Sequence, residues 1–206
     1  MHPRFNDEIG TKANTLRKRR KSTRLPCYDY STSGAYFVTL CTQNRCFLFG
    51  EVLNGDVILN PFGQIVDEEW RRSAMIRDEI ELDEFVIMPN DLHAVIIIAG
   101  ELRAASGPTE EATGRSSLQT TRMPRLPKRS LGSLVAGFKT ATTKRINILR
   151  GTLSAQVWQR NFYDRIIRED AELERIRRYI FENPMRWQFD QENPAVLERA
   201  IDDPWL

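Results

Sequence analysis

Two apolar stretches, separated by a short turn, constrain the fold of this chain more than any other feature. Residues 80–88 (IELDEFVIM) and 92–99 (LHAVIIIA) are rich in β-branched and aromatic residues, as strands usually are. Pro89 and Asn90 join them, and strands joined by so short a connection pair antiparallel. The sequence therefore predicts an antiparallel sheet that contains this hairpin.

The remaining pattern adds strands and helices to that sheet. Asn54-Gly55 favours a two-residue turn between strands at 50–53 and 56–59. The other predicted elements are a strand at 35–42, helices at 62–77, 130–149 and 170–181, and an extended piece at 162–167. Pro184 predicts that the last helix ends before it, because the residue that precedes a proline avoids helical geometry. The predicted fold class is α+β, a mostly antiparallel sheet with helices on one face.

Composition excludes several classes of protein. The chain has 206 residues, of which 41% are hydrophobic and 28% charged, as in a soluble globular protein rather than a disordered or collagenous one. No apolar run approaches the roughly 20 residues that span a membrane. The first residues have no apolar stretch after a charged start, so we expect no secretory signal. Three cysteines are too few for a disulfide framework. We therefore expect a cytoplasmic protein with no membrane partner.

Charge is segregated along the chain, although 30 Lys and Arg nearly balance 28 Asp and Glu. A flexible basic tail is predicted over residues 1–24, where cations occur with no acid after Thr11, among them Arg17, Lys18, Arg19, Arg20 and Lys21. Such a block either attracts nucleic acid or is a solvated tail that binds nothing. Residues 101–129, rich in Ser, Thr, Gly and Pro, predict a long loop, and residues 188–206 form an acidic tail.

His93 is the one plausible catalytic or ligand imidazole, because the only other histidine is the second residue of the chain. Residues two apart on a strand point the same way, so Asp91 and His93 are expected to project side by side. Such a pair holds a divalent cation, orients the ring for proton transfer, or simply makes a satisfied hydrogen bond. These interpretations stay open at this level.

Tyr179 and Asn183 form the second candidate pair. They lie four residues apart on the predicted last helix and therefore share a face. The alternative is that Tyr179 is a boundary residue with its ring in the core.

Four segments, in order along residues 24–187, together resemble the insertion-sequence-200-like single-tyrosine HUH transposases, and especially the REP-associated tyrosine transposases. Met88–Ile96 (MPNDLHAVI) resembles the MPNHxHxxx segment of that family. The other three are LPCYDY with GAYFVTLCT at 25–42, VWQRNFYDRIIR at 157–168, and YIFENPMRW at 179–187. Residues 25–187 are accordingly expected to form one transposase-like domain.

The resemblance implies a ferredoxin-like domain that cuts and rejoins single-stranded DNA at hairpins by transesterification, through a 5′-phosphotyrosine. It implies Tyr179 as nucleophile, and Asp91, His93 and Asn183 as ligands of Mg²⁺ or Mn²⁺. Arg177, Arg178 and the basic block at 17–21 would contact the DNA backbone. Monomers and homodimers both occur among the proteins that this chain resembles.

One position departs from the family pattern. Asp91 stands where the family has the first histidine of its HUH motif. A carboxylate is a good ligand for hard cations, but it adds one negative charge next to the phosphate. The sequence therefore leaves two alternatives, a working variant of the enzyme and a catalytically impaired relative that binds DNA on the same fold.

Overall fold

The structure is a computed structural model that describes residues 28–99, 129–190 and 193. The basic tail predicted at 1–24 lies outside the described residues, as do almost all of the loop predicted at 101–129 and most of the acidic tail predicted at 188–206.

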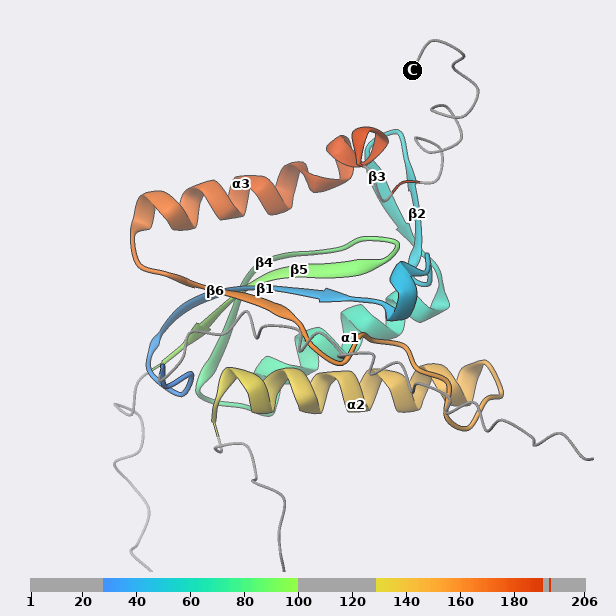
Figure 1. Cartoon of the computed structure of the whole chain (residues 1–206), viewed down its shortest axis with the longest axis horizontal. Helices are drawn as coiled ribbons and strands as arrows, with labels where there is room; N and C mark the ends of the chain where they lie inside the picture. Colours follow the sequence, from blue (N-terminus) through green and yellow to red (C-terminus); the bar gives the residue numbers. More distant parts are fainter. Residues whose placement is uncertain (1–27, 100–128, 191–192, 194–206) are drawn as a thin grey trace, which may run out of the picture.

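A four-stranded antiparallel sheet lies at the centre of the described domain (Figure 1). Its strands follow the order β4 (Ile80–Ile87), β5 (Asp91–Ile98), β1 (Gly34–Cys41) and β6 (Tyr163–Ile167). Strands β4 and β5 form the hairpin predicted over residues 80–99, and they pair antiparallel as expected.

Among the described residues, three α-helices and a second hairpin complete the fold. Helix α1 (Pro61–Met75) precedes β4, helix α2 (Leu131–Leu149) precedes β6, and helix α3 (Asp170–Arg186) follows β6. The chain order of the sheet and its first two helices is βαββαβ, with β1 and β5 in the middle of the sheet. This is the ferredoxin-like arrangement, so the predicted α+β class with an antiparallel sheet is confirmed.

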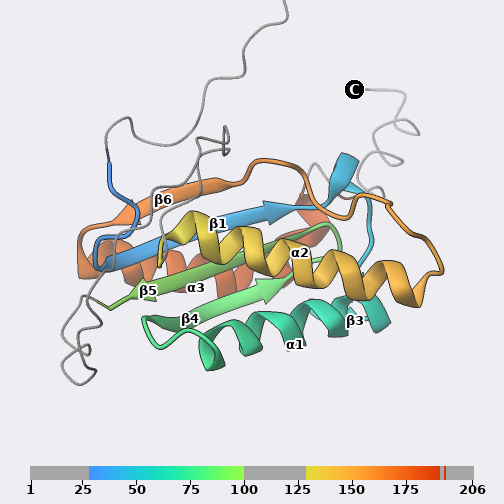
Figure 2. The ribbon, with the colours of Figure 1, turned by 90° about the horizontal axis from the view of Figure 1, so that it is seen from below.

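Helices α1 and α2 cover one face of the sheet (Figure 2). Alternate residues of the central strands point toward them, so that Val38 of β1 and Ala94 of β5 are both fully buried in that core. The rings of Trp70 on α1 and Phe138 on α2 meet edge to face, with their centroids 4.9 Å apart.

Helix α3 covers the opposite face, so the prediction of helices on one face holds for α1 and α2 but not for α3 (Figure 1). The physical reason is that the central strands are apolar on both faces. Phe37 of β1 and Val95 of β5 point away from α1 and α2, and they pack against Ile180 of α3. Without α3, that second apolar face would be left in water.

The end of α3 corrects a second prediction. The helix does not end before Pro184 but continues through it to Arg186, followed by a 3-10 turn at Trp187–Phe189. The proline removes one helical hydrogen bond, and its ring crowds the carbonyl four residues earlier, so the continuation needs support from packing. Burial of Ile180 and Trp187 on either side of it holds the helix in place. Asn183 is therefore helical and stays on the same face as Tyr179.

The second hairpin is formed by β2 (Gly50–Leu53) and β3 (Asp56–Leu59), as predicted. Asn54 and Gly55 have φ values of 55° and 86°, which match the two-residue turn that Asn-Gly favours. Among the described residues, none of the helices has the length and the apolar character needed to cross a membrane.

Candidate active site

Strand β5 places Asp91 and His93 side by side on the face covered by α3. Asp91 is the first residue of the strand and pairs with Cys41, and His93 pairs with Thr39. Leu92, between them, points into the other core. Both side chains are buried, and their placement on the face opposite to Leu92 is the alternation expected along a strand.

Asp91 and His93 approach each other closely. His93 Nε2 lies 3.2 Å from Asp91 Oδ1, and Thr39 Oγ1 lies 2.9 Å from His93 Nδ1. The threonine contact fixes the orientation of the imidazole ring, because it occupies the nitrogen that faces away from Asp91. Asp91 Oδ1 is buried, and within the described part of the chain it has no hydrogen-bond partner of acceptable geometry, even though His93 is near. A carboxylate oxygen and an imidazole nitrogen, both able to ligate a cation, therefore lie together at this site.

Helix α3 brings Tyr179 to this pair. The Tyr179 ring stands edge-on to the His93 ring with the centroids 5.4 Å apart, and edge-on to Phe37 at 6.0 Å. The side chain is 39% exposed, so the candidate nucleophile is open to solvent on one side. The structure therefore brings Tyr179, His93 and Asp91 together from two separate elements.

The Tyr179 hydroxyl has a raised pKa. Burial is the largest cause, and the negative charge of Asp91 is the next. A hydrogen bond with the side chain of Asn183 acts in the opposite direction and lowers the pKa. The buried Asn183 is thus connected to the site through Tyr179, one helical turn away.

The donor set suits a hard divalent cation in part. Carboxylate oxygen, imidazole nitrogen and amide oxygen all ligate Mg²⁺ or Mn²⁺. Within the described ranges, no group of three or more His, Cys, Asp and Glu could hold a metal ion. A cation bound at Asp91 and His93 would therefore need the Asn183 amide, water or substrate oxygens to complete its shell.

Arg45 is a neighbour of the site that the sequence analysis missed. It ends a 3-10 turn at Gln43–Arg45, directly after β1, and its Nη1 lies 3.6 Å from Asp91 Oδ2. Asn44 and Arg45 both adopt positive φ, at 57° and 55°, which turns the chain back toward the start of β5. No local pattern predicts this contact, because it depends on the pairing of β1 with β5.

The predicted DNA-binding arginines differ in their surroundings. Arg177 bonds the carboxylate of Asp83 on β4, with its Nε 2.8 Å from Asp83 Oδ1, and also contacts Glu174. Arg178 is exposed. The basic block at 17–21 lies outside the described residues. The DNA contacts expected of these three groups stay predictions.

Comparison with known proteins places the chain in a family. No family model matches it. A protein of Haemophilus influenzae, described only as an uncharacterized protein, is 35% identical over 182 residues, which span 88% of this chain and 97% of that protein. The chain belongs to the same family as this Haemophilus protein. This family relationship assigns no activity to the chain, because the relative is described without one.

A solved structure shares the fold. A REP-associated tyrosine transposase bound to a REP hairpin superposes with a TM-score of 0.52 and 15% identity, over 79% of this chain and 73% of that one. At this identity the likeness shows the fold of this chain and nothing about its chemistry.

Proposed function

We propose that this protein is a transposase-like enzyme that cleaves and rejoins single-stranded DNA at hairpins, with Tyr179 as the nucleophile. The observation that carries the proposal is the meeting of Tyr179 on α3 with His93 and Asp91 on β5, at a ring distance of 5.4 Å. The segments that resemble the single-tyrosine transposases supply these residues. A structural neighbour with a hairpin bound supports hairpin DNA as substrate.

The proposed reaction is a transesterification that balances without an outside reactant. The Tyr179 oxygen loses its proton and attacks the scissile phosphorus. A bond forms between phosphorus and the tyrosine oxygen while the bond from phosphorus to the 3′ oxygen breaks, and that oxygen leaves with a proton as a hydroxyl. Because a phenol is a better leaving group than an alkyl alcohol, a 3′ hydroxyl can reverse the step and rejoin the strand.

Asp91, His93 and Asn183 would hold the divalent cation, Mg²⁺ or Mn²⁺. The buried, unsatisfied Asp91 Oδ1 next to His93 Nε2 supports this assignment. When bound, the cation would supply positive charge that polarises the phosphate. Thr39 holds the imidazole in place, and Phe37 packs against both the His93 and the Tyr179 ring. Two side chains of β1 thus position the histidine and the tyrosine.

The test is formation of a covalent protein–DNA adduct on a labelled hairpin oligonucleotide, followed on a denaturing gel with Mn²⁺. The native protein is expected to give a slow band, and Tyr179→Phe is expected to lose it completely. Tyr163→Phe is the matched control, since Tyr163 is also exposed and also packs against Phe37, but lies on β6. An adduct of equal yield in Tyr179→Phe would refute the assignment of the nucleophile.

The second candidate function is DNA binding without cleavage. It is favoured by Asp91, whose charge raises the pKa of Tyr179 and so opposes the loss of its proton. The same assay with Asp91→His separates the two. A band in Asp91→His and none in the native protein would support the impaired relative. A band in the native protein would establish that a carboxylate serves at this position.

A further inference from the structure

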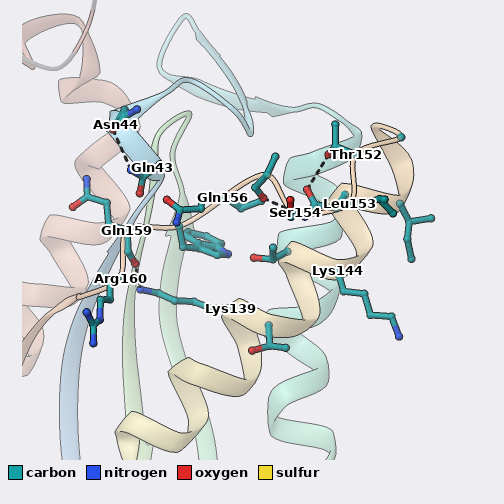
Figure 3. Close-up of a pocket in the computed structure, with 18 of the residues that line it drawn as sticks. Gln43, Asn44, Lys139, Lys144, Thr152, Leu153, Ser154, Gln156, Gln159 and Arg160 are labelled. Atoms are coloured by element: carbon teal, nitrogen blue, oxygen red, sulfur yellow. Dashed lines mark hydrogen bonds between the residues drawn. The ribbon is translucent and has the colours of Figure 1, made fainter.

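A second concave surface lies on the α2 side of the molecule and takes no part in the site described above. The groove runs between the C-terminal half of α2 and the segment 151–161, and it extends to Gln43 and Asn44 (Figure 3). Its volume of about 1820 Å³ exceeds the roughly 300–1,000 Å³ of most small-molecule pockets. A groove of this size fits a length of polymer better than a metabolite.

The lining of the groove is polar and has one sign of charge. Lys139, Lys144 and Arg160 contribute cations, and none of the described residues that line it is Asp or Glu. Lys144 and Arg160 are exposed and flank the groove on opposite sides in Figure 3. The other polar groups are amides and hydroxyls, among them those of Gln43, Asn44, Ser154 and Gln156. This chemistry suits phosphates together with the edges of unpaired bases.

The wall formed by segment 151–161 is fixed to α2 although it has little regular structure. Lys139 Nζ donates to the carbonyls of Gln159 and Asn161, at 2.8 and 3.1 Å. Arg150 donates to the carbonyl of Ala155 at 2.8 Å, and Trp158 Nε1 donates to Thr142 Oγ1 at the same distance. The groove is therefore preformed, which lowers the entropic cost of binding a flexible strand.

Two apolar side chains stand at the edge of the groove. Leu153 is fully exposed, and Ile148 is 71% exposed. Apolar groups exposed next to amides offer contact surface to the apolar faces of unpaired bases, which a duplex would keep stacked. The groove thus favours a single strand over a double helix.

One end of the groove lies next to the candidate active site. Gln43 and Asn44 line it, and the next residue, Arg45, has its guanidinium 3.6 Å from Asp91 Oδ2. We propose that the groove binds a single-stranded DNA segment that continues from the cleaved strand past the end of β1. This proposal rests on the proposed function for its choice of DNA and deepens it.

The experiment compares the full chain with a double variant, Lys144→Gln with Arg160→Gln. The matched control, Arg72→Gln with Arg168→Gln, loses the same charge from exposed positions outside the groove. Binding is measured by fluorescence anisotropy to a hairpin with a single-stranded tail and to the same hairpin without it, across a series of salt concentrations. Melting temperatures confirm that the variants fold.

We expect the tail to tighten binding to the native protein, and the groove variant to lose about tenfold in affinity for the tailed hairpin alone. The slope of log K against log salt should fall by about 1.4, at roughly 0.7 per phosphate contact on a single strand. The control should bind like the native protein. Equal affinity of native protein and groove variant for the tailed hairpin would overturn the proposal, as would an equal loss for both hairpins.

The two experiments together distinguish a failure of the groove proposal from a failure of the proposed function. A loss of tail binding without any adduct at Tyr179 would support the groove and contradict the enzyme. An adduct with no effect of the groove variant would support the enzyme and contradict the groove. Failure of the native protein to bind either hairpin would contradict both.

Discussion

At the scale of single residues, Gly63 shows how one missing side chain shapes the fold. It lies in the first turn of α1, and a Cβ atom there would lie 2.1 Å from the carbonyl oxygen of Phe49. That oxygen also accepts a hydrogen bond from the amide of Asn60, which caps the helix. The glycine therefore lets α1 start directly against the residue before β2.

We predict that Gly63→Ala destabilises the protein by about 1–3 kcal/mol, as overpacking does, despite the better helix propensity of alanine. The control is Gly137→Ala on α2, where a Cβ would meet no atom of the described residues within 4 Å. That change should stabilise by about 0.5–1 kcal/mol. Urea denaturation of both variants checks the pair, and a stabilising Gly63→Ala would contradict the packing argument.

Tyr36 provides a pH prediction at the same scale. Its side chain is fully buried, and burial is the main cause that raises the pKa of Tyr36 to about 12. The unfolded chain ionises this phenol near pH 10, so the stability it contributes is complete below pH 10 and is lost as the pH rises toward 12.

We expect the native protein to lose about 1 kcal/mol more stability than Tyr36→Phe between pH 9 and pH 11, measured by urea denaturation. Tyr36→Phe also loses the hydrogen bond from the Tyr36 hydroxyl to the Thr32 carbonyl. That loss is the same at every pH, so it does not affect the comparison of how stability changes with pH. Parallel pH profiles of the two proteins would show that another tyrosine accounts for the decline.

At the scale of elements, the position of α3 decides whether the site exists, because α3 carries Tyr179 while β5 carries His93. The Arg177 guanidinium on α3 lowers the pKa of the Asp83 carboxyl on β4 by hydrogen bonding. The stability from this pair is therefore present above the unfolded pKa of aspartate and is lost as the pH falls through the lower folded value.

We predict that Arg177→Gln and Asp83→Asn each lower the melting temperature at pH 7, and that the double variant loses little more than either one. The neighbouring Arg178→Gln, at an exposed position, should change it least. At a pH low enough to protonate Asp83, below the lowered pKa of its carboxyl, the effect of Arg177→Gln should shrink. Calorimetry at both pH values checks this, and fully additive losses would mean that the two residues act independently.

At the scale of the whole molecule, a bound cation would connect β5 to α3 and so stabilise the folded state. Mn²⁺ added at about 100 times its dissociation constant should raise stability by about 2.7 kcal/mol, and chelation should reverse the rise. The expected result is an increase of several degrees in melting temperature for the native protein, and none for His93→Ala. An equal increase in His93→Ala would place the cation elsewhere.

The sequence by itself determined most of the elements, because their signals are local. The β-branched and aromatic runs and the Asn54-Gly55 turn each act within a few residues, and the structure has the strands and helices where they were expected, apart from the end of α3. The side-by-side placement of Asp91 and His93 follows from the two-residue period of a strand, and the sequence predicted it for the same reason.

Tertiary contacts alone set the face that α3 covers, its passage through Pro184 and the neighbour of Asp91. Each of these depends on contacts between residues far apart in the chain. Phe37 and Val95 draw α3 to the second face of the sheet, and burial of Ile180 and Trp187 keeps the helix continuous across its proline. Arg45 reaches Asp91 only because β1 pairs with β5. Burial of apolar surface between distant segments outweighs the local preference of a single residue, and a local pattern does not contain that information.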